Sequence, residues 1–166
     1  MNKQQFRDAM ARLGAAVSIV TSNGDAGLAG CTASAICSVT DEPPTLLICL
    51  NRASRNNASF RRNGRLCVNI LASTHEDLAR AFSAAEKPLE DRFGSGRWIV
   101  GDNGCPALED AIASVECDIA DVSEVGSHSV FFCRVTASRT KEAGDALIYF
   151  GRAFHRIDPV NLDVAL

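Results

Sequence analysis

The chain has 166 residues, 46% of them hydrophobic, which is enough for a substantial core, and we expect a single domain over residues 1–166. The formal net charge of −3 and the pI near 5.6 give no overall positive field, so we expect neither nucleic acid nor a membrane as a partner. The apolar runs are too short to cross a bilayer, and the first ten residues lack the apolar core of a signal peptide, which predicts a cytoplasmic protein.

The cysteines predict packing rather than covalent chemistry. Their number, seven, is odd, and no two of them form the Cys-x-x-Cys pair that zinc ribbons and redox dithiols need. We therefore expect most of them to be buried, with a single reactive thiol as the alternative. They stand at positions 31, 37, 49, 67, 105, 117 and 133.

In chain order, the first expected element is a helix over residues 2–13, where Phe6, Met10 and Leu13 recur at helical spacing before Gly14 ends it. Short β-type runs follow, separated by turn-forming Gly, Pro, Asn and Asp residues. These runs cover residues 16–21, 30–39, 45–51, 65–71, 114–122, 129–139 and 146–150, the last continuing toward residue 157.

Three short helices are expected in the gaps between these strands. Ser54 can cap a helix that runs to Asn63 and stops at Gly64. Thr74 with Asp77 resembles a capping box before a second helix, and residues 106–112 suggest a third. The pattern lacks the regular alternation of strand and helix that a doubly wound sheet requires. It predicts a mainly β fold, an antiparallel barrel with a few short helices.

Several nucleotide and metal motifs are absent from the sequence. There is no G-x-G-x-x-G after a strand, no P-loop and no H-E-x-x-H, which disfavours the Rossmann and P-loop modes of nucleotide binding. The three histidines, His75, His128 and His155, are far apart and have no carboxylates at ligand spacing, so no metal site is predicted.

The segment of residues 31–40 carries small and hydroxyl side chains where a core strand would carry Val, Ile and Leu. Small residues allow a flat ring to approach the backbone, and hydroxyl groups can bind the polar edge of that ring. An isoalloxazine ring fits this description, whereas the alternative is a strand that packs closely against a helix. The hydroxyls belong to Thr32, Ser34, Ser38 and Thr40.

The expected helix after Ser54 begins beside Arg52 and Arg55. Free amides at a helix N-terminus next to arginines form a competent phosphate site, although an ordinary solvated helix start is the alternative. Arg92 could likewise reach a ligand phosphate or pair with the carboxylates beside it.

The turn Gly126-Ser-His128 lies between two β-type runs and could present an imidazole at the mouth of a barrel. A lone turn histidine is more often simply exposed. Tyr149, Arg152 and His155 lie near the last strand and are expected to be structural.

These segments together resemble the flavin reductase family that supplies two-component flavin-dependent monooxygenases, including the reductases for 4-hydroxyphenylacetate hydroxylase and for the pyrimidine-utilisation oxygenase. The resemblance covers nearly the whole chain. The motifs that carry it are Phe6-Arg-Asp-Ala-Met, Gly14-Ala-Ala-Val, Thr32-Ala-Ser-Ala-Ile-Cys-Ser-Val-Thr, Pro43-Pro-Thr-Leu-Leu-Ile-Cys-Leu-Asn, Cys67-Val-Asn, Glu90-Asp-Arg-Phe, Gly126-Ser-His, and Leu147-Ile-Tyr-Phe with Phe154-His155.

The resemblance implies a split β-barrel of the FMN-binding, Greek-key kind and a homodimer with flavin near the subunit interface. It implies that Arg92 and Phe93 border the flavin and that His128 helps to place the nicotinamide. The residues implied to line the isoalloxazine ring and ribityl chain are Thr32, Ala33, Ser34, Ser38, Val39 and Thr40. Those implied to approach the ribityl-phosphate end are Asn51, Ser54 and Asn57.

The activity that the resemblance implies is NAD(P)H-dependent reduction of FMN or FAD, by hydride transfer to flavin N5, with the reduced flavin diffusing to a partner monooxygenase. We expect His128 to orient the nicotinamide rather than to act as an obligatory acid. The sequence does not choose between FMN and FAD. The lack of a compact basic cluster for a 2′-phosphate favours NADH over NADPH.

Three alternative functions remain open at this point. The first is a reductase with tightly bound flavin that passes electrons to another acceptor, such as a cobalt corrinoid. The second is a flavin-binding module without catalysis, and the third is a cysteine-based redox protein.

Overall fold

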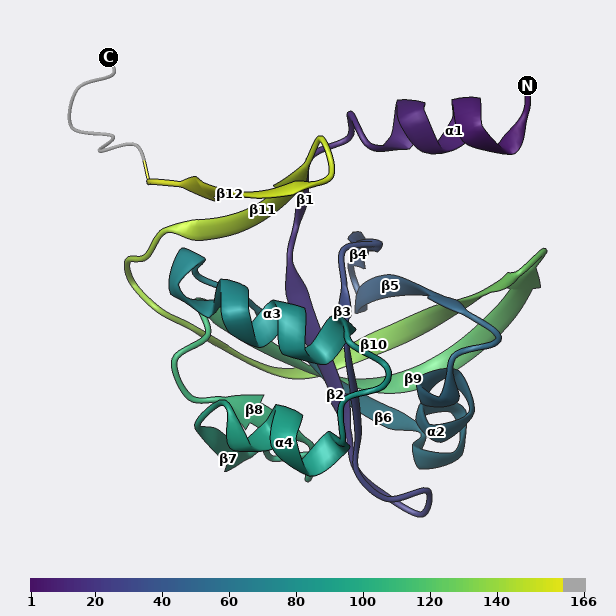
Figure 1. Ribbon diagram of the computed structural model, residues 1–166. Coiled ribbons are helices and arrows are strands. Elements are labelled where there is room, and N and C mark those ends of the chain that lie inside the picture. The colour runs from purple at the N-terminus through teal and green to yellow at the C-terminus, as the bar shows by residue number, and fades with distance from the viewer. Residues whose placement is uncertain (160–166) are drawn as a thin grey trace.

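Strands dominate the computed structural model, which describes residues 1–159 (Figure 1). The strands are β1 (Ala15–Ala16), β2 (Ser18–Ser22), β3 (Ala29–Ala33), β4 (Ile36–Asp41), β5 (Pro44–Asn51), β6 (Arg65–Ile70), β7 (Trp98–Val100), β8 (Pro106–Leu108), β9 (Ala113–Val125), β10 (His128–Thr140), β11 (Ala146–Phe150) and β12 (Ala153–Ile157). The helices are α1 (Lys3–Met10), α2 (Arg55–Asn63), the 3₁₀ turn η1 (Ser73–His75), α3 (Glu76–Ser83) and α4 (Leu89–Gly94).

Seven antiparallel strands form one sheet in the order β3-β2-β6-β9-β10-β5-β4. Its two edges, β3 and β4, are separated in the chain only by Ser34 and Ala35. A residue spans at most about 3.6 Å, so this junction brings the edges within roughly 11 Å of each other and the sheet closes on itself. Within residues 1–159, no backbone hydrogen bond joins β3 to β4, so the barrel has an open seam. The expected mainly β fold, a split β-barrel, is confirmed.

Two hydrophobic clusters fill the space inside and beside this barrel. The interior contains Val20, Ile48, Phe60, Leu66, Val68 and Phe131, with Phe60 contributed by α2. The second cluster lies under α3 and contains Val17, Ile19, Leu78, Phe82, Leu108 and Leu147. In Figure 1, α3 lies across the barrel close to β3, and α2 lies at the far end beside β6. The two helices therefore flank β3 from different sides.

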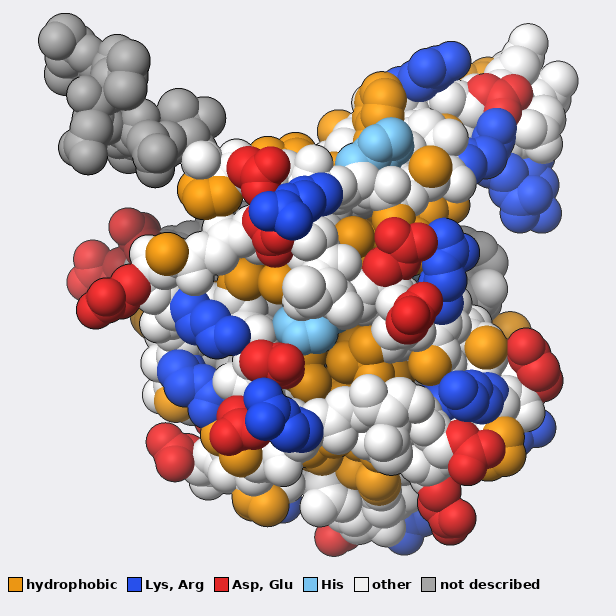
Figure 2. Space-filling view, turned by 60° about the vertical axis from the view of Figure 1, so that its left-hand side comes forward, with side chains coloured by type: hydrophobic (Ala, Val, Ile, Leu, Met, Phe, Trp, Pro, Cys, Tyr) orange, Lys and Arg blue, Asp and Glu red, His pale blue; other side chains and the backbone are white. Residues whose placement is uncertain are grey.

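A small sheet of β1, β11 and β12 extends from the barrel and carries α1 (Figure 1). No residue of α1 is buried, and the side chains of Phe6 and Met10 are 49% and 47% exposed. The helix is held by the backbone amide of Gly151, which donates to the carbonyl of Ala11 at 2.7 Å, and by an ion pair between Arg152 and Asp8. Figure 2 shows this part as a lobe with hydrophobic side chains on its surface.

The structure corrects the expected helix over residues 106–112. Residues Pro106–Leu108 instead form β8, which pairs with β7. The buried side chain of Asn69 helps to hold this conformation, because its Oδ1 accepts the amide of Leu108 at 2.7 Å. A buried amide acceptor needs such a donor, so tertiary bonding overrides the local helical pattern.

Three further expectations need adjustment. The run of residues 30–39 is not one strand but β3 and β4, broken at Ser34. The capping box at Thr74 is wrong, because the chain enters α3 through the η1 turn, where Nδ1 of His75 accepts the amide of Ala72 at 3.2 Å. The helix expected over residues 2–13 is shorter, Lys3–Met10, and the short elements α4 and β7 were not predicted.

The expected helix after Ser54 is confirmed, and Gly64 ends it with φ of 69°. This left-handed conformation suits glycine, which lacks a Cβ. Over residues 1–159, no helix is long and apolar enough to cross a membrane.

Candidate functional site

The end of β3 and the junction after it present the hydroxyl-rich segment. Thr32 and Ala33 are half-buried, whereas Ser34 is exposed. The hydroxyl of Thr32 donates to the carbonyl of Ala79 in α3 at 2.6 Å, which fixes this strand to the helix. Because the Thr32 hydroxyl proton is used within the protein, its oxygen and methyl group remain for a ligand.

The edge strand β4 is exposed to an unusual degree. Every residue from Cys37 to Asp41 is exposed, so both faces of the strand lack cover from the rest of the chain. Val39 is 48% exposed and lies at a β-bulge between Ser38 and Thr40. An uncovered edge strand can bind another molecule through its unpaired backbone groups and its apolar and hydroxyl side chains. Ser38, Val39 and Thr40 therefore lie together where a ligand or a second chain could cover them.

Gly30 of β3 lies where two aromatic rings approach the backbone. A Cβ at this position would come within 2.8 Å of the Phe82 ring and 3.2 Å of the Phe93 ring. Phe82, Phe93 and Trp98 pack in edge-to-face and tilted pairs with ring centroids 5.0–5.5 Å apart. The amide of Gly30 donates to Oδ1 of Asn56 at 3.1 Å, which ties β3 to the first turn of α2.

A cavity of about 320 Å³ opens beside Thr32, Ala33 and Ser34. Its other walls come from α3 and from the β11–β12 hairpin, and they include Arg80, Ser83, Tyr149, Arg152 and Phe154. Tyr149 and Arg152 also line a second cavity of about 520 Å³, which α1 covers and which reaches Ser34. Tyr149 and Arg152 were expected to be structural, and Arg152 does hold α1 through its ion pair with Asp8. The pairing of β1 with β11 places them at the site, and no local sequence pattern reveals that pairing.

The first turn of α2 has the character of an anion site. Ser54 makes no capping bond with its side chain, and no acidic residue stands in the first turn. Within residues 1–159, the backbone amides of Arg55 and Asn56 donate to no protein acceptor. Such amides, together with the helix dipole, favour a bound anion.

The structure does not place the Arg52 side chain as a phosphate ligand. Its Nε pairs with Glu124 at 2.7 Å, and its Nη1 donates to the carbonyl of Gly126 at 3.3 Å. Arg55 makes no ion pair with residues 1–159 and is the arginine left at this helix start.

Asn57, unlike the exposed Asn51, is buried and bonded within the protein. Its Nδ2 donates to Ser129 Oγ at 2.9 Å and lies 3.3 Å from the carbonyl of Leu50, while its Oδ1 accepts Arg61 Nε at 3.0 Å. Asn57 therefore connects α2 to β5 and β10. Its amide has little capacity left for a ligand.

His128 is the first residue of β10 and directly opposes Asn51 on β5, so the fold brings these two predicted residues together. Both are exposed. Oδ1 of Asn51 accepts the amide of Ala53 at 2.9 Å, and Nδ1 of His128 lies 2.9 Å from the hydroxyl of Ser127. The two-residue turn before His128 contains Gly126 with φ of 56°. The imidazole therefore projects from a short, well-defined hairpin.

Arg92 is buried, and its guanidinium is used within the protein. Its Nε donates to the carbonyl of Lys87 at 2.7 Å and its Nη2 to the carbonyl of Ala85 at 3.0 Å. It holds the loop between α3 and α4 and lies near Cys31 of β3. Phe93, next to it, belongs to the aromatic cluster beside Gly30.

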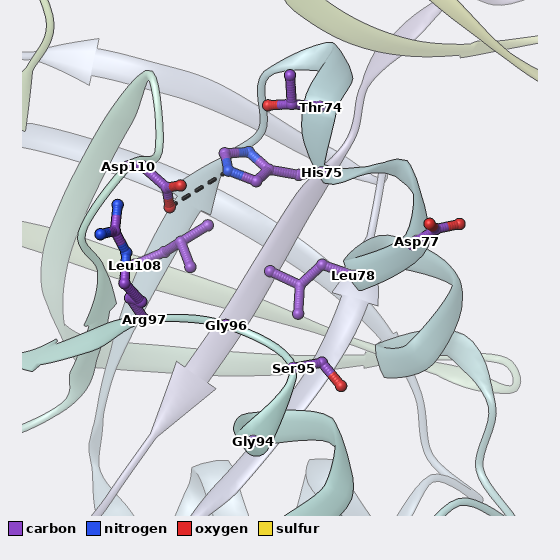
Figure 3. Close-up of a pocket in the computed structure, with 10 residues that line it drawn as sticks. All are labelled: Thr74, His75, Asp77, Leu78, Gly94, Ser95, Gly96, Arg97, Leu108 and Asp110. Atoms are coloured by element: carbon purple, nitrogen blue, oxygen red, sulfur yellow. Dashed lines mark ion pairs between the residues drawn. The ribbon is translucent and has the colours of Figure 1, made fainter.

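A third cavity, of about 380 Å³, lies away from these residues between η1, α3 and the loop after α4 (Figure 3). His75 and Asp110 face each other there, with Nε2 and Oδ1 3.3 Å apart but without a well-aligned hydrogen bond. Although partial burial opposes its ionisation, contact with His75 lowers the pKa of the Asp110 carboxyl. The pair joins η1 to the chain ahead of β9.

The cysteines are placed as the sequence predicts. Five are buried, and burial raises the pKa of Cys31, Cys67 and Cys133 to about 12. Cys37 on β4 is exposed, and Cys49 is intermediate. Residues 1–159 contain no group of three or more His, Cys, Asp and Glu side chains arranged to hold a metal ion.

Comparison with known proteins matches the flavin reductase like domain over residues 10–158. The chain is 50% identical over 156 residues to a 4-hydroxyphenylacetate 3-monooxygenase reductase component of Pseudomonas aeruginosa, covering 93% of this chain and 92% of that protein. It is 53% identical over 154 residues to an FMN reductase (NADH) of Bradyrhizobium diazoefficiens, covering 93% and 85% respectively. A solved structure from Haemophilus somnus, assigned as a flavin reductase, has a TM-score of 0.91 at 39% identity and covers 95% of this chain and 100% of that one.

Proposed function

Because the chain belongs to the flavin reductase-like domain family, we propose that it reduces FMN or FAD with NAD(P)H and supplies the reduced flavin to a partner monooxygenase. A bound flavin supplies the hydride acceptor and a nicotinamide the donor. The protein then has to bind both rings, place them face to face and shield them from water.

The observation that carries this proposal is the open seam between β3 and β4. The seam combines half-buried small residues on β3 with a β4 strand that is exposed on both faces. A flat heterocycle can lie against such a surface and cover it. In the proposed site, the ring and ribityl chain contact Thr32, Ala33, Ser34, Ser38, Val39 and Thr40.

The ribityl-phosphate end is proposed to approach the start of α2. An anion there is supported by the free backbone amides of Arg55 and Asn56 and by Ser54, whose side chain makes no capping bond. Asn51 is the last residue of the adjoining strand, β5. Asn57 acts in this proposal by holding α2 in place rather than by direct contact, because its amide is bonded internally. Arg92 likewise supports the border of the site through its loop, with Phe93 as the apolar neighbour.

His128 is proposed to orient the nicotinamide ring or its carboxamide. Its exposure on a short turn and its position opposite Asn51 support this role. The 53% identity to an FMN reductase that uses NADH supports NADH as the donor and FMN as the flavin.

We also propose that the active form is a homodimer that buries the exposed apolar residues around the seam. Phe6, Met10 and Leu13 near α1 and Val39 on β4 are all at least 47% exposed. Such a set is typical of a surface that another chain covers. Sedimentation velocity of the purified protein should give one species of twice the mass of the chain, and a single monomeric species at micromolar concentration would contradict this part.

The activity is tested by anaerobic stopped-flow absorbance with NADH or NADPH and FMN or FAD. We expect fast loss of the oxidised-flavin band with NADH, and flavin that exchanges freely with solution. The variant His128→Ala should raise the KM for NADH about tenfold, while His155→Ala, which changes a histidine on β12, should not. If neither nicotinamide bleaches either flavin, the protein is a flavin-binding module and not a reductase.

A further inference from the structure

A cluster of polar side chains lies directly behind the turn that carries His128. Its members are Arg52, which directly follows β5, Asn57 and Arg61 of α2, Glu124 of β9 and Ser129 of β10. Glu124 is the centre of the cluster, and it is the one carboxylate within residues 1–159 that pairs with two arginines, Arg52 and Arg61.

The hydroxyl of Ser129 makes all the hydrogen bonds that it can form within this cluster. This hydroxyl accepts from Asn57 Nδ2 at 2.9 Å and from Arg61 Nη2 at 2.9 Å, and it can donate its one proton to Glu124 at 3.3 Å. Ser129 is fully buried and lies opposite Glu124 in the β9–β10 pair. A saturated arrangement of this kind holds one conformation.

Arg52 links this cluster to the Gly126–Ser127 turn by two hydrogen bonds. Its backbone amide donates to the carbonyl of Ser127 at 2.9 Å, and its Nη1 donates to the carbonyl of Gly126 at 3.3 Å. One residue therefore holds both carbonyls of the two-residue turn that precedes His128. The direction of its guanidinium is fixed on the other side by the contact of Nε with Glu124 at 2.7 Å.

We propose that Glu124 is a positioning residue for the reaction, acting through Arg52 and the Gly126–Ser127 turn to fix the imidazole of His128 against the nicotinamide. This inference rests on the proposed role of His128. The Arg52 and Glu124 side chains are 54% and 42% exposed, and such ion pairs contribute little to folding stability. The Arg52–Glu124 pair is therefore better suited to aligning the turn than to stabilising the fold.

The test compares Glu124→Gln with Asp121→Asn, which removes a carboxylate from the same strand, β9, but makes no bond to the turn. Each substitution is made in the wild-type protein and in the His128→Ala variant. The KM for NADH and the dissociation constant for FMN are then measured. We expect Glu124→Gln to raise the KM for NADH about tenfold, with FMN affinity unchanged, because a small displacement of a positioning group weakens alignment. In the His128→Ala background, Glu124→Gln should add nothing.

The outcomes separate the two proposals. If His128→Ala raises the KM but Glu124→Gln does not, the inference about Glu124 is wrong and the role of His128 stands. Equal, additive increases in both backgrounds would also overturn it, since Glu124 would then act by another route. If His128→Ala leaves the KM for NADH unchanged, the proposed role of His128 itself is wrong. If Glu124→Gln does not fold, Arg52→Lys keeps the charge but loses the fork that reaches both partners, and it should give the same selective rise.

Discussion

Gly30 is a position in the candidate site at which an added Cβ does not fit. The Phe82 and Phe93 rings occupy the space that a Cβ would need, with the nearest atom 2.8 Å away. We expect Gly30→Ala to lower the free energy of unfolding by about 1–3 kcal/mol, because it overpacks a close contact, and to weaken flavin binding by displacing β3. Urea unfolding and flavin titration of the same sample measure both effects.

Gly94→Ala provides the control for that substitution. Gly94 belongs to α4, next to Phe93, but a Cβ there meets no atom within 4 Å. The substitution Gly94→Ala should leave the free energy of unfolding unchanged or raise it slightly, because alanine is the better helix former. Equal destabilisation by both variants would show that the aromatic contact at Gly30 is not the cause.

At the scale of elements, Asp145 fastens the start of β11 to the η1 turn. Its carboxylate accepts from the Ser73 hydroxyl at 2.5 Å and from the Ser73 amide at 2.9 Å, and these bonds lower the pKa of Asp145 below its usual 3.8. A lowered pKa in the folded state means that the ionised group stabilises the fold above pH 3.8 and that this contribution is lost as the pH falls through the folded value.

Asp145→Asn should therefore be less stable than wild type at pH 6, and the difference should shrink as the pH falls below 3.8. Urea unfolding from pH 6 to pH 3 follows this difference. Asp25→Asn, an exposed position without a bonded partner within residues 1–159, should stay close to wild type throughout. A constant gap between wild type and Asp145→Asn across the range would contradict the assignment.

The strands of the barrel could be predicted because apolar residues in short runs between turn formers are a local signal. β8 could not, since its conformation depends on Asn69, which is far away in sequence. A contact distant in sequence also explains why the prediction for Arg52 was wrong. Its position close to Ser54 suggested a phosphate ligand, but its side chain pairs with Glu124, which is on another strand. The hydroxyl-rich segment was identified because its composition is unusual in itself, whereas Tyr149 enters the site only through the β1–β11 pairing.

At the scale of the whole molecule, the buried thiols make stability sensitive to alkali. The folded state holds Cys31, Cys67 and Cys133 protonated up to a pKa of about 12, whereas in the unfolded chain they ionise near 9.0. A raised pKa in the folded state means that the contribution is fully present below pH 9 and is lost as the pH rises above it. The free energy of unfolding should therefore fall steadily above pH 9.

Replacing one of these thiols should reduce that dependence. Cys133→Ala should flatten the decline between pH 9 and pH 11, despite its cost at neutral pH from the lost packing. In the native protein at pH 8, a thiol reagent should modify the five buried cysteines only slowly. Rapid modification of the buried cysteines under those conditions would show that the barrel opens more readily than this packing allows.

The pairing of β1 with β11 also determines when the site can form during synthesis. Ala15 lies opposite Tyr149, so a strand made at the beginning must wait for one made near the end. Until residues 146–154 have left the ribosome, the cavity beside Thr32 lacks one wall and β1 lacks its partner strand. Closing so long a loop is slow and leaves unpaired strands available to other chains. The nascent protein should therefore complete the cavity beside Thr32 only after residues 146–154 have emerged.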